Sequence, residues 1–352
     1  MFGDYEAQRH WMEISVNLPV KEWYVNSTRN DLQYWGLDYP PLTAYVSYAF
    51  GRLAQWCGYG ELVALGSSRG YESVETKYFM RMTVLACDAL LFLPAIGLAL
   101  YSINASRHLS VPRLASLVYL VFISPAFILI DHGHFQYNCF SLGLVVYSVW
   151  CHWNGRDWCG AILFVLSLAF KQMSLYYAPA YFFYLLARTR IGAGRRKVGL
   201  GVTFFRLIGL GSIVIATFVI CFLPFLSSFE LLSQVFHRMF PFARGLYEDK
   251  VANFWCASSI LIKWHLWFPK QQMVRASLFM TFLALVPSCL HVYRYPSRRS
   301  FLYTLAGSAL AFYLFSFQVH EKTILLPLLP IALMIQQHTL LFSWASTIAT
   351  FR

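Results

Sequence analysis

The sequence predicts an all-α polytopic membrane protein, and three features predict it: composition, the spacing of apolar runs and the placement of basic residues. The chain has 352 residues, of which 58% are apolar and only 12% are charged. Soluble domains contain roughly 45–50% apolar and about 25% charged residues. Because a water-soluble fold cannot cover so much apolar surface with so few charges, we expect most of the chain to lie in a lipid bilayer.

Apolar runs of spanning length follow one another from about residue 79 onward. A transmembrane helix needs about 20 predominantly apolar residues. Such runs predict spans at 79–102, 114–131, 137–153, 158–172 paired with 175–188, 203–227, 272–291, 301–319 and 323–350. Several are short or contain a proline, at Pro125, Pro179 and Pro224. Because broken helices are tolerated where they line a cavity enclosed by protein, these interruptions favour such a cavity.

Charged residues divide the chain into two regions. Residues 1–77 hold nine of the sixteen acids, together with many aromatic residues. We interpret 1–77 as a luminal acidic and aromatic loop region with amphipathic helices, one of them near Pro41 to Trp56. Residues 78–352 then form a multi-spanning domain with short luminal motif loops.

The net charge of +12 arises mostly in three connections between apolar runs, at 103–113, 188–200 and 293–300. This is the pattern of cytoplasmic loops under the positive-inside rule. The opposite face then carries 1–77 and the connections 132–136, 171–174, 228–252 and 320–322. The basic residues do not form a stripe interleaved with aromatic residues, so a nucleic-acid partner is not expected.

The eight cysteines contain no CxxC pair and no metal-ligand spacing with histidine. Most lie within apolar runs, where cysteine behaves as a small hydrophobic residue. The sequence therefore predicts neither a disulfide framework nor a zinc site.

Two carboxylates on the acidic face are candidates for catalysis. A carboxylate can take a proton from an acceptor hydroxyl, which is the task of a general base. Asp4 lies in Gly3-Asp4-Tyr5-Glu6, and Asp38 lies just ahead of Pro40-Pro41. Asp4 could instead cap a helix, and Asp38 could simply be a turn residue.

Cationic side chains on the same face are candidates for holding a phosphate, since they stabilise charge on a departing oxygen. The candidates, from four segments, are His132, His134, Lys171, Arg244, Lys250, His320 and Lys322. Each segment has a plainer interpretation: interfacial anchoring for the histidine pair, snorkelling for Lys171, a solvated loop at 241–250 and a short turn at 318–322. The two histidines have no third ligand of clear spacing, so no metal is predicted.

Seven motifs in order along the chain carry a resemblance to a known family. They are GDYEAQRHWMEI, LQYWGLDYPPLTAY, SRGYES, DHGHFQYN, KQM, PFARGLYEDKVANFWC and FSFQVHEKTILLPLLP. The chain resembles the ALG glucosyltransferases of asparagine-linked glycosylation, a family of the GT-C class, from residue 3 to 330. The motifs are most similar to one branch of this family in the endoplasmic reticulum. Enzymes of that branch use dolichyl phosphate glucose and add the first glucose, by an α-1,3 bond, to the lipid-linked high-mannose oligosaccharide.

This resemblance implies a GT-C-like helix bundle in the endoplasmic reticulum membrane with a luminal active site. It implies an inverting transfer from dolichyl phosphate β-glucose to the dolichyl-pyrophosphate-linked oligosaccharide, without a metal or cofactor. It makes Asp4 the leading candidate for the base and Asp38 a supporting or acceptor-positioning acid. The cations would then hold the donor phosphate.

The sequence also departs from the family pattern. Family members begin with a hydrophobic helix ahead of GDYEAQRHW and continue with further helices past the HEK turn, so this chain is expected to lack both. The alternatives within enzymes are the second-glucose branch, which shares LDYPP, and related dolichyl-phosphate-sugar transferases. Alternatives of another class are a membrane transporter, against which the absence of an inverted repeat counts, and an inactive truncated scaffold.

Overall fold

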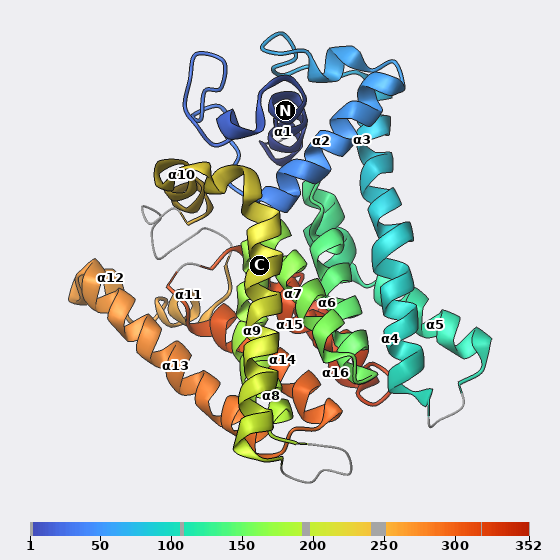
Figure 1. Ribbon diagram of the computed structural model, residues 1–352, viewed down its shortest axis with the longest axis vertical. Helices are drawn as coiled ribbons and strands as arrows, with labels where there is room; N and C mark the ends of the chain where they lie inside the picture. The colour runs from blue at the N-terminus through green and yellow to red at the C-terminus, as the bar shows by residue number, and fades with distance from the viewer. Residues whose placement is uncertain (1–2, 106–108, 192–197, 241–250, 318, 352) are drawn as a thin grey trace.

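The computed structural model describes residues 3–105, 109–191, 198–240, 251–317 and 319–351, and these form a bundle of helices (Figure 1). The described residues contain α-, 3-10 and π-helices and no strand. The predicted all-α class is therefore confirmed.

The N-terminal region covers one end of the bundle, at the top of Figure 1. It contains α1 (Gly3–Asn17), η1 (Val20–Glu22), α2 (Pro41–Trp56) and η2 (Gly60–Val63). Pro41 occupies the first position of α2, where its missing N–H and fixed φ favour a helix start. The helices α1 and α2 approach closely at Gly51, where an added Cβ would lie 2.5 Å from Val16 Cγ2.

Within the described ranges, three helices are long and apolar enough to cross a membrane: Val74–Ile103, Leu200–Ser227 and Lys270–Arg294. They contain the predicted spans 79–102, 203–227 and 272–291. A fourth crossing results if Val111–Phe122 and Phe127–His134, which meet at 41°, form one broken span. The break contains Pro125, as expected for a residue that interrupts helical hydrogen bonding.

The long helices named above and the shorter helices between them follow one another along the chain. Along the chain, the helices of the bundle are α3 (Val74–Cys87), η3 (Asp88–Phe92), α4 (Leu93–Ile103), α5 (Val111–Phe122), η5 (Phe127–Asp131), η6 (His132–His134), α6 (Asn138–Trp153), α7 (Asp157–Phe170), η7 (Gln172–Tyr177) and α8 (Ala178–Thr189). They continue with α9 (Leu200–Phe222), η9 (Leu223–Ser227), α10 (Phe229–Met239), α11 (Phe254–Ser258), α12 (Trp264–Trp267), α13 (Lys270–Arg294), α14 (Arg298–Phe315), η10 (Glu321–Ile324), α15 (Leu325–Leu333) and α16 (Thr339–Ile348).

The predicted span 323–350 is not one helix. The structure divides it into α15 and α16, with residues 334–338 in a non-helical connection. Three polar residues in a row, Gln336, Gln337 and His338, interrupt the apolar run at this connection. Length and mean hydropathy alone did not reveal this break.

The outer faces of the long helices are apolar and exposed. Ile215 and Ile220 on α9, and Leu278 and Phe282 on α13, are each more than 60% exposed. Contiguous exposed apolar surface of this kind on helices of spanning length fits contact with lipid acyl chains. The chain is a multi-pass membrane protein.

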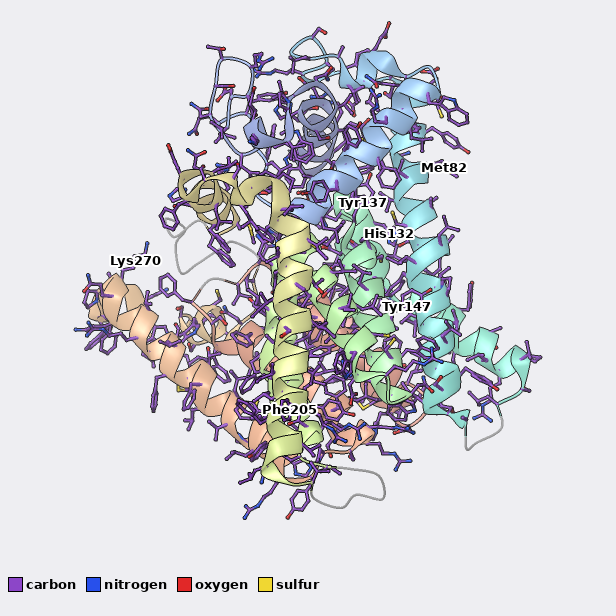
Figure 2. All side chains as sticks on the ribbon, in the orientation of Figure 1. Met82, His132, Tyr137, Tyr147, Phe205 and Lys270 are labelled. Carbon is purple, nitrogen blue, oxygen red and sulfur yellow. The ribbon has the colours of Figure 1, made fainter. Side chains whose placement is uncertain are left out.

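The two ends of the bundle carry different segments. Figure 2 shows Met82 and Tyr137 toward the α1 end and Phe205, near the start of α9, at the opposite end. The Tyr137 hydroxyl shares a hydrogen bond of 2.7 Å with Thr83 Oγ1. This bond ties the start of α6 to α3 and fixes the preceding turn, 131–136, at the α1 end.

Candidate active site

The helix α1 is anchored through buried ion pairs on one of its faces. Arg9 is fully buried, and its guanidinium donates to Glu6 at 2.6 and 2.8 Å and to Glu13 at 2.8 Å. Its remaining donors bind the Leu62 carbonyl oxygen, at 2.9 Å, and the Ser68 hydroxyl. These residues, spaced three or four apart, fix one face of α1 against the chain that follows α2.

Glu13 is the most strongly held carboxylate of this network. Burial alone would raise its pKa, but hydrogen bonds from His10, the Gly66 N–H and Arg9 outweigh burial. The pKa of Glu13 is thereby lowered to about 2. The network is complete around this side chain, as a buried charge requires.

The other face of α1 lines a polar cavity of about 400 Å³. Asp4, Ala7, Gln8 and Trp11 follow the spacing of one helical face and border this cavity. The other walls come from the 32–39 segment, Gln136, residues 171–173, Arg238, His320 and Lys322. Side chains from six separate parts of the chain therefore converge at one place.

Asp4 is bound on both carboxylate oxygens. Its Oδ2 accepts from the Lys322 ammonium at 2.6 Å, and its Oδ1 accepts from the Gln136 amide at 2.9 Å. Lys322 is buried, whereas the Asp4 side chain is 33% exposed. The carboxylate is thus oriented by two partners and still reachable from the cavity.

Lys171 reaches the same group of side chains from the end of α7. The helix stops at Phe170, and Lys171 takes an extended conformation, with φ −144° and ψ 121°. Its ammonium donates to Gln136 Oε1 at 3.0 Å and to Asn138 Oδ1, and lies 4.6 Å from the centre of the Tyr39 ring. Gln136 therefore joins Lys171 to Asp4 through its two amide atoms.

The segment that carries Asp38 is tied to α10 by its backbone. Arg238 donates to the carbonyl oxygens of Gly36, at 2.8 Å, and Leu37, at 3.2 Å. Gln172 donates to the carbonyl oxygens of Asp38, at 3.4 Å, and Met239, at 3.1 Å. These bonds place Asp38 on the wall of the cavity that also holds Asp4.

Trp35 presents an aromatic face to this cavity. It is 47% exposed and takes a positive φ of 49°, which is uncommon for a bulky residue. Its carbonyl oxygen accepts from the Trp11 indole at 2.9 Å, and an added Cβ on Gly3 would lie 2.5 Å from its ring. Strained backbone of this kind tends to occur at functional sites.

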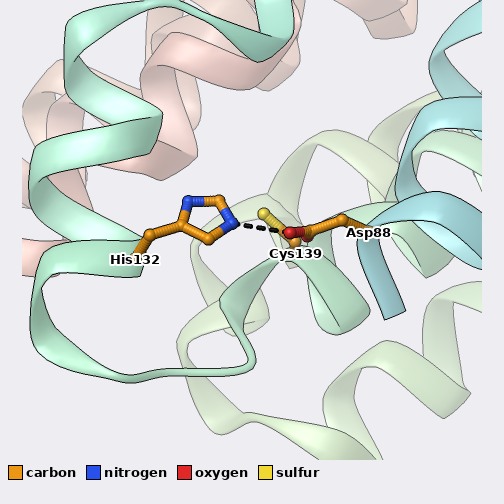
Figure 3. A group of neighbouring side chains, drawn as sticks. All are labelled: Asp88, His132 and Cys139. Carbon is orange, nitrogen blue, oxygen red and sulfur yellow. Dashed lines mark hydrogen bonds and ion pairs between the residues drawn. The ribbon is translucent and has the colours of Figure 1, made fainter. Parts of the chain in front are cut away.

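His132 and His134 do not line the cavity. His132 Nε2 lies 2.6 Å from Asp88 Oδ2, and Figure 3 shows this pair with Cys139 behind it. His134 pairs with Glu321 at 3.2 Å. Both histidines therefore hold the turn from which Gln136 extends.

Asp88, His132 and Cys139 lie close enough to share a cation, since their donor atoms are within 4.8 Å of one another (Figure 3). The protein already provides partners for this group. His132 binds Asp88, and the Cys139 thiol donates to Asp131 Oδ2 at 3.0 Å. Asp131 also accepts from the Cys139 N–H and the Asn138 amide, so it caps the start of α6.

The structure brings together five of the predicted site residues on one cavity: Asp4, Asp38, Lys171, His320 and Lys322. Arg244 and Lys250 lie outside the described residues. Sequence reasoning did not single out Gln136, Trp35 or Arg238. Of these three, only Gln136 lay in a segment marked by its density of polar residues, the run 131–138. No such signal marked Trp35 or Arg238, which are recognised only once the chain is folded.

Comparisons with known proteins show the family to which this chain belongs. The profile of the ALG6, ALG8 glycosyltransferase family matches residues 1–352. A dolichyl pyrophosphate Man9GlcNAc2 alpha-1,3-glucosyltransferase of Rattus norvegicus is 46% identical over 354 residues, which cover 100% of this chain and 68% of that protein. Probable enzymes of the same name from Dictyostelium discoideum and Arabidopsis thaliana are 46% and 49% identical, over 100% and 95% of this chain and 67% and 61% of theirs.

This chain spans roughly two thirds of the length of these relatives. The family match extends over the whole chain and so spans the residues of all seven motifs. The resemblance expected from those motifs is confirmed, and the chain belongs to the ALG6, ALG8 glycosyltransferase family.

Proposed function

We propose that this chain transfers glucose, with inversion, from dolichyl phosphate glucose to the terminal mannose of a dolichyl-pyrophosphate-linked high-mannose oligosaccharide. The names of its relatives state the acceptor and the α-1,3 bond. The observation that supports the proposal most strongly is the contact of Asp4 with Lys322 on a polar cavity. This contact puts a candidate base beside a candidate phosphate ligand.

In this mechanism Asp4 takes the proton of the attacking mannose hydroxyl. The hydroxyl oxygen forms a bond to C1 of glucose while the bond between C1 and the donor phosphate oxygen breaks. The electron pair of the broken bond leaves with dolichyl phosphate. Attack from the side opposite the phosphate converts a β-linked donor into an α-linked product.

Lys322, Lys171 and His320 would stabilise the negative charge that develops on the phosphate. Lys322 and Lys171 are already buried and hydrogen-bonded, so little reorganisation would be needed during the reaction. Gln136 orients the Asp4 carboxylate through its amide. Asp38 would position the acceptor from the facing wall.

Arg244 and Lys250 are proposed as further phosphate ligands. The segment that holds them follows α10, whose Arg238 borders the cavity. For His132 and His134 we propose a positioning role instead, through the contacts with Asp88 and Glu321 that hold the 131–138 turn.

We further propose that the protein resides in the endoplasmic reticulum membrane with the Asp4 cavity in the lumen. The end of α8, which carries Arg188, and the start of α14, which carries Arg298 and Arg299, lie at the other end of the bundle from α1 (Figure 1). Basic connections favour the cytoplasmic side. The cavity would then face the lumen.

The test is glucosyl transfer by the purified full chain in lipid nanodiscs. Dolichyl phosphate glucose and a lipid-linked Man9GlcNAc2 acceptor should give a product with one added glucose and an α-1,3 bond. Replacing the donor with dolichyl phosphate mannose, or the acceptor with one that already carries a glucose, should abolish transfer. Preference for the glucosylated acceptor would contradict the proposal and assign the chain to the second-glucose reaction.

A further inference from the structure

A second cavity, of about 670 Å³, lies at the end of the bundle away from Asp4. It forms where α6 and α8 end and α14 begins. The helix α7 runs between the two ends, with Asp157 near this cavity and Phe170 beside Lys171. Its 14 residues, at about 1.5 Å per residue, separate the ends by about 20 Å.

Three arginines line the second cavity: Arg188, Arg298 and Arg299. Arg188 donates to Asp157 Oδ2 at 3.2 Å, so its charge is offset. The Arg298 guanidinium lies 5.9 Å from the centre of the Trp153 ring. Arg299 is exposed and makes no hydrogen bond or ion pair with a residue that the structure describes. Two positive charges of this cavity therefore lack a carboxylate partner among the described residues.

The start of α14 adds to the positive potential here. This helix has 18 residues, and its N-cap Ser297 accepts from the Ser300 N–H at 3.0 Å. The first N–H groups of a helix have no intrahelical acceptor, and the helix dipole favours an anion beside them. The Arg298 and Arg299 side chains extend from this same first turn. Side chains and backbone thus favour the same kind of ligand.

Three aromatic side chains contribute to the remaining walls, and exposed apolar surface lies nearby on α13. Trp153, Tyr184 and Tyr295 border the cavity. Tyr and Trp are enriched at the headgroup level of membranes, because their rings are apolar and their polar atoms can reach water. Leu290 on α13, five residues before Tyr295, is 54% exposed. A ligand in this cavity could therefore place a phosphate group among the arginines and its own apolar tails along α13.

We propose that this cavity binds the headgroup of an anionic phospholipid. Basic pockets between transmembrane helices on the cytoplasmic side recognise such headgroups. A free phosphate would meet the same arginines but would leave the aromatic walls and the apolar surface of α13 unused. The site lies about a helix length from Asp4, and its occupancy does not depend on the proposed glucosyl transfer.

The test is native mass spectrometry of the purified full chain, titrated separately with phosphatidylinositol, phosphatidylcholine and inorganic phosphate. We expect phosphatidylinositol to bind in preference to phosphatidylcholine and to resist displacement by inorganic phosphate. Each of Arg298→Gln and Arg299→Gln should weaken phosphatidylinositol binding about fivefold. Arg294→Gln, a matched change on the same end but outside the cavity, should leave binding unaltered.

Arg299→Gln removes an exposed side chain without a described partner, so this variant should keep the wild-type melting temperature. Equal binding of the two phospholipids by the wild type would overturn the proposal. So would an Arg298→Gln/Arg299→Gln double variant that retains wild-type binding of phosphatidylinositol. Arginine-dependent binding of inorganic phosphate without binding of phosphatidylinositol would assign the cavity to a free anion and overturn the lipid assignment.

Discussion

The cavity that holds Asp4 and the cavity that holds Arg298 and Arg299 arrange their charges differently. At the α1 end, acids and bases contact one another, as in the 2.6 Å contact between Asp4 and Lys322, and Lys171 is only 3% exposed. At the other end, Arg298 and Arg299 are exposed and share one sign. A buried set of mixed sign holds reacting groups in fixed positions, as catalysis requires. An exposed set of one sign attracts an anion without such positioning.

This comparison also shows where the stability of the fold is most vulnerable. Fixed charges at the α1 end need complete networks, because an unpaired buried charge is costly. The other end relies more on packing, as the stacked rings of Tyr184 and Phe301, 4.3 Å apart between centroids, illustrate. Substitutions at the two ends should therefore differ in size and in pH dependence.

Arg9→Gln is expected to have the largest effect on stability. It leaves Glu6 and Glu13 buried without their common partner, which should lower the free energy of unfolding by about 3–5 kcal/mol. The matched control is Arg29→Gln, which breaks an exposed pair with Glu22 and should cost about 0–1 kcal/mol. Denaturant titration of both variants measures the difference. Equal costs would show that the α1 network is not a fixed unit.

Lys322→Gln should mainly affect the reaction. Loss of the ammonium that contacts Asp4 removes a group that we place at the departing phosphate, so the transfer rate should fall about 10²–10³-fold. Lys77→Gln breaks the exposed pair with Glu72 and should leave the rate unchanged. Steady-state glucosyl transfer measures both variants. A Lys322→Gln enzyme with the wild-type rate would remove Lys322 from the mechanism.

Gly160→Ala tests packing at the arginine end. An added Cβ would lie 2.4 Å from His152 Nε2, and overpacking of this kind costs about 1–3 kcal/mol. Gly201→Ala, in α9, meets nothing within 4 Å and should be neutral or slightly stabilising. Thermal unfolding of the two variants gives the comparison. If Gly160→Ala is as stable as the wild type, the side chains at this end are packed less tightly than the contacts around Gly160 indicate.

Acid should weaken the α1 network, with no effect near neutral pH, where Glu13 is fully ionised. The pKa of Glu13 is lowered from its ordinary 4.5 to about 2, so its ionised form stabilises the fold above pH 4.5. This contribution is lost as the pH falls from about 4.5 through 2. The melting temperature of the wild type should therefore drop over this range, and that of Glu13→Gln should drop less. Parallel pH profiles would show that Glu13 does not supply the stabilisation.

The sequence predicted the helical class and three long spans well, because composition and apolar length depend on neighbouring residues alone. It did not predict the contact between Asp4 and Lys322, which are 318 residues apart and meet only after packing. Gln136 was overlooked because an amide carries no charge, although it joins Lys171 to Asp4. The positive φ of Trp35 depends on tertiary packing in the same way. The division of 323–350 was missed for another reason, because length and mean hydropathy average over the three polar residues 336–338.

The most direct test of the central assignment is the glucosyl-transfer rate of Asp4→Asn beside Asp38→Asn, with donor binding measured on the same preparations. The amide is nearly isosteric with the carboxylate but cannot accept the proton. We predict that Asp4→Asn loses about 10²–10⁴-fold in rate and still binds dolichyl phosphate glucose. Asp38→Asn should lose less and mainly raise the KM for the acceptor. An Asp4→Asn enzyme with the wild-type rate, or a larger loss for Asp38→Asn, would contradict the assignment of Asp4 as the base.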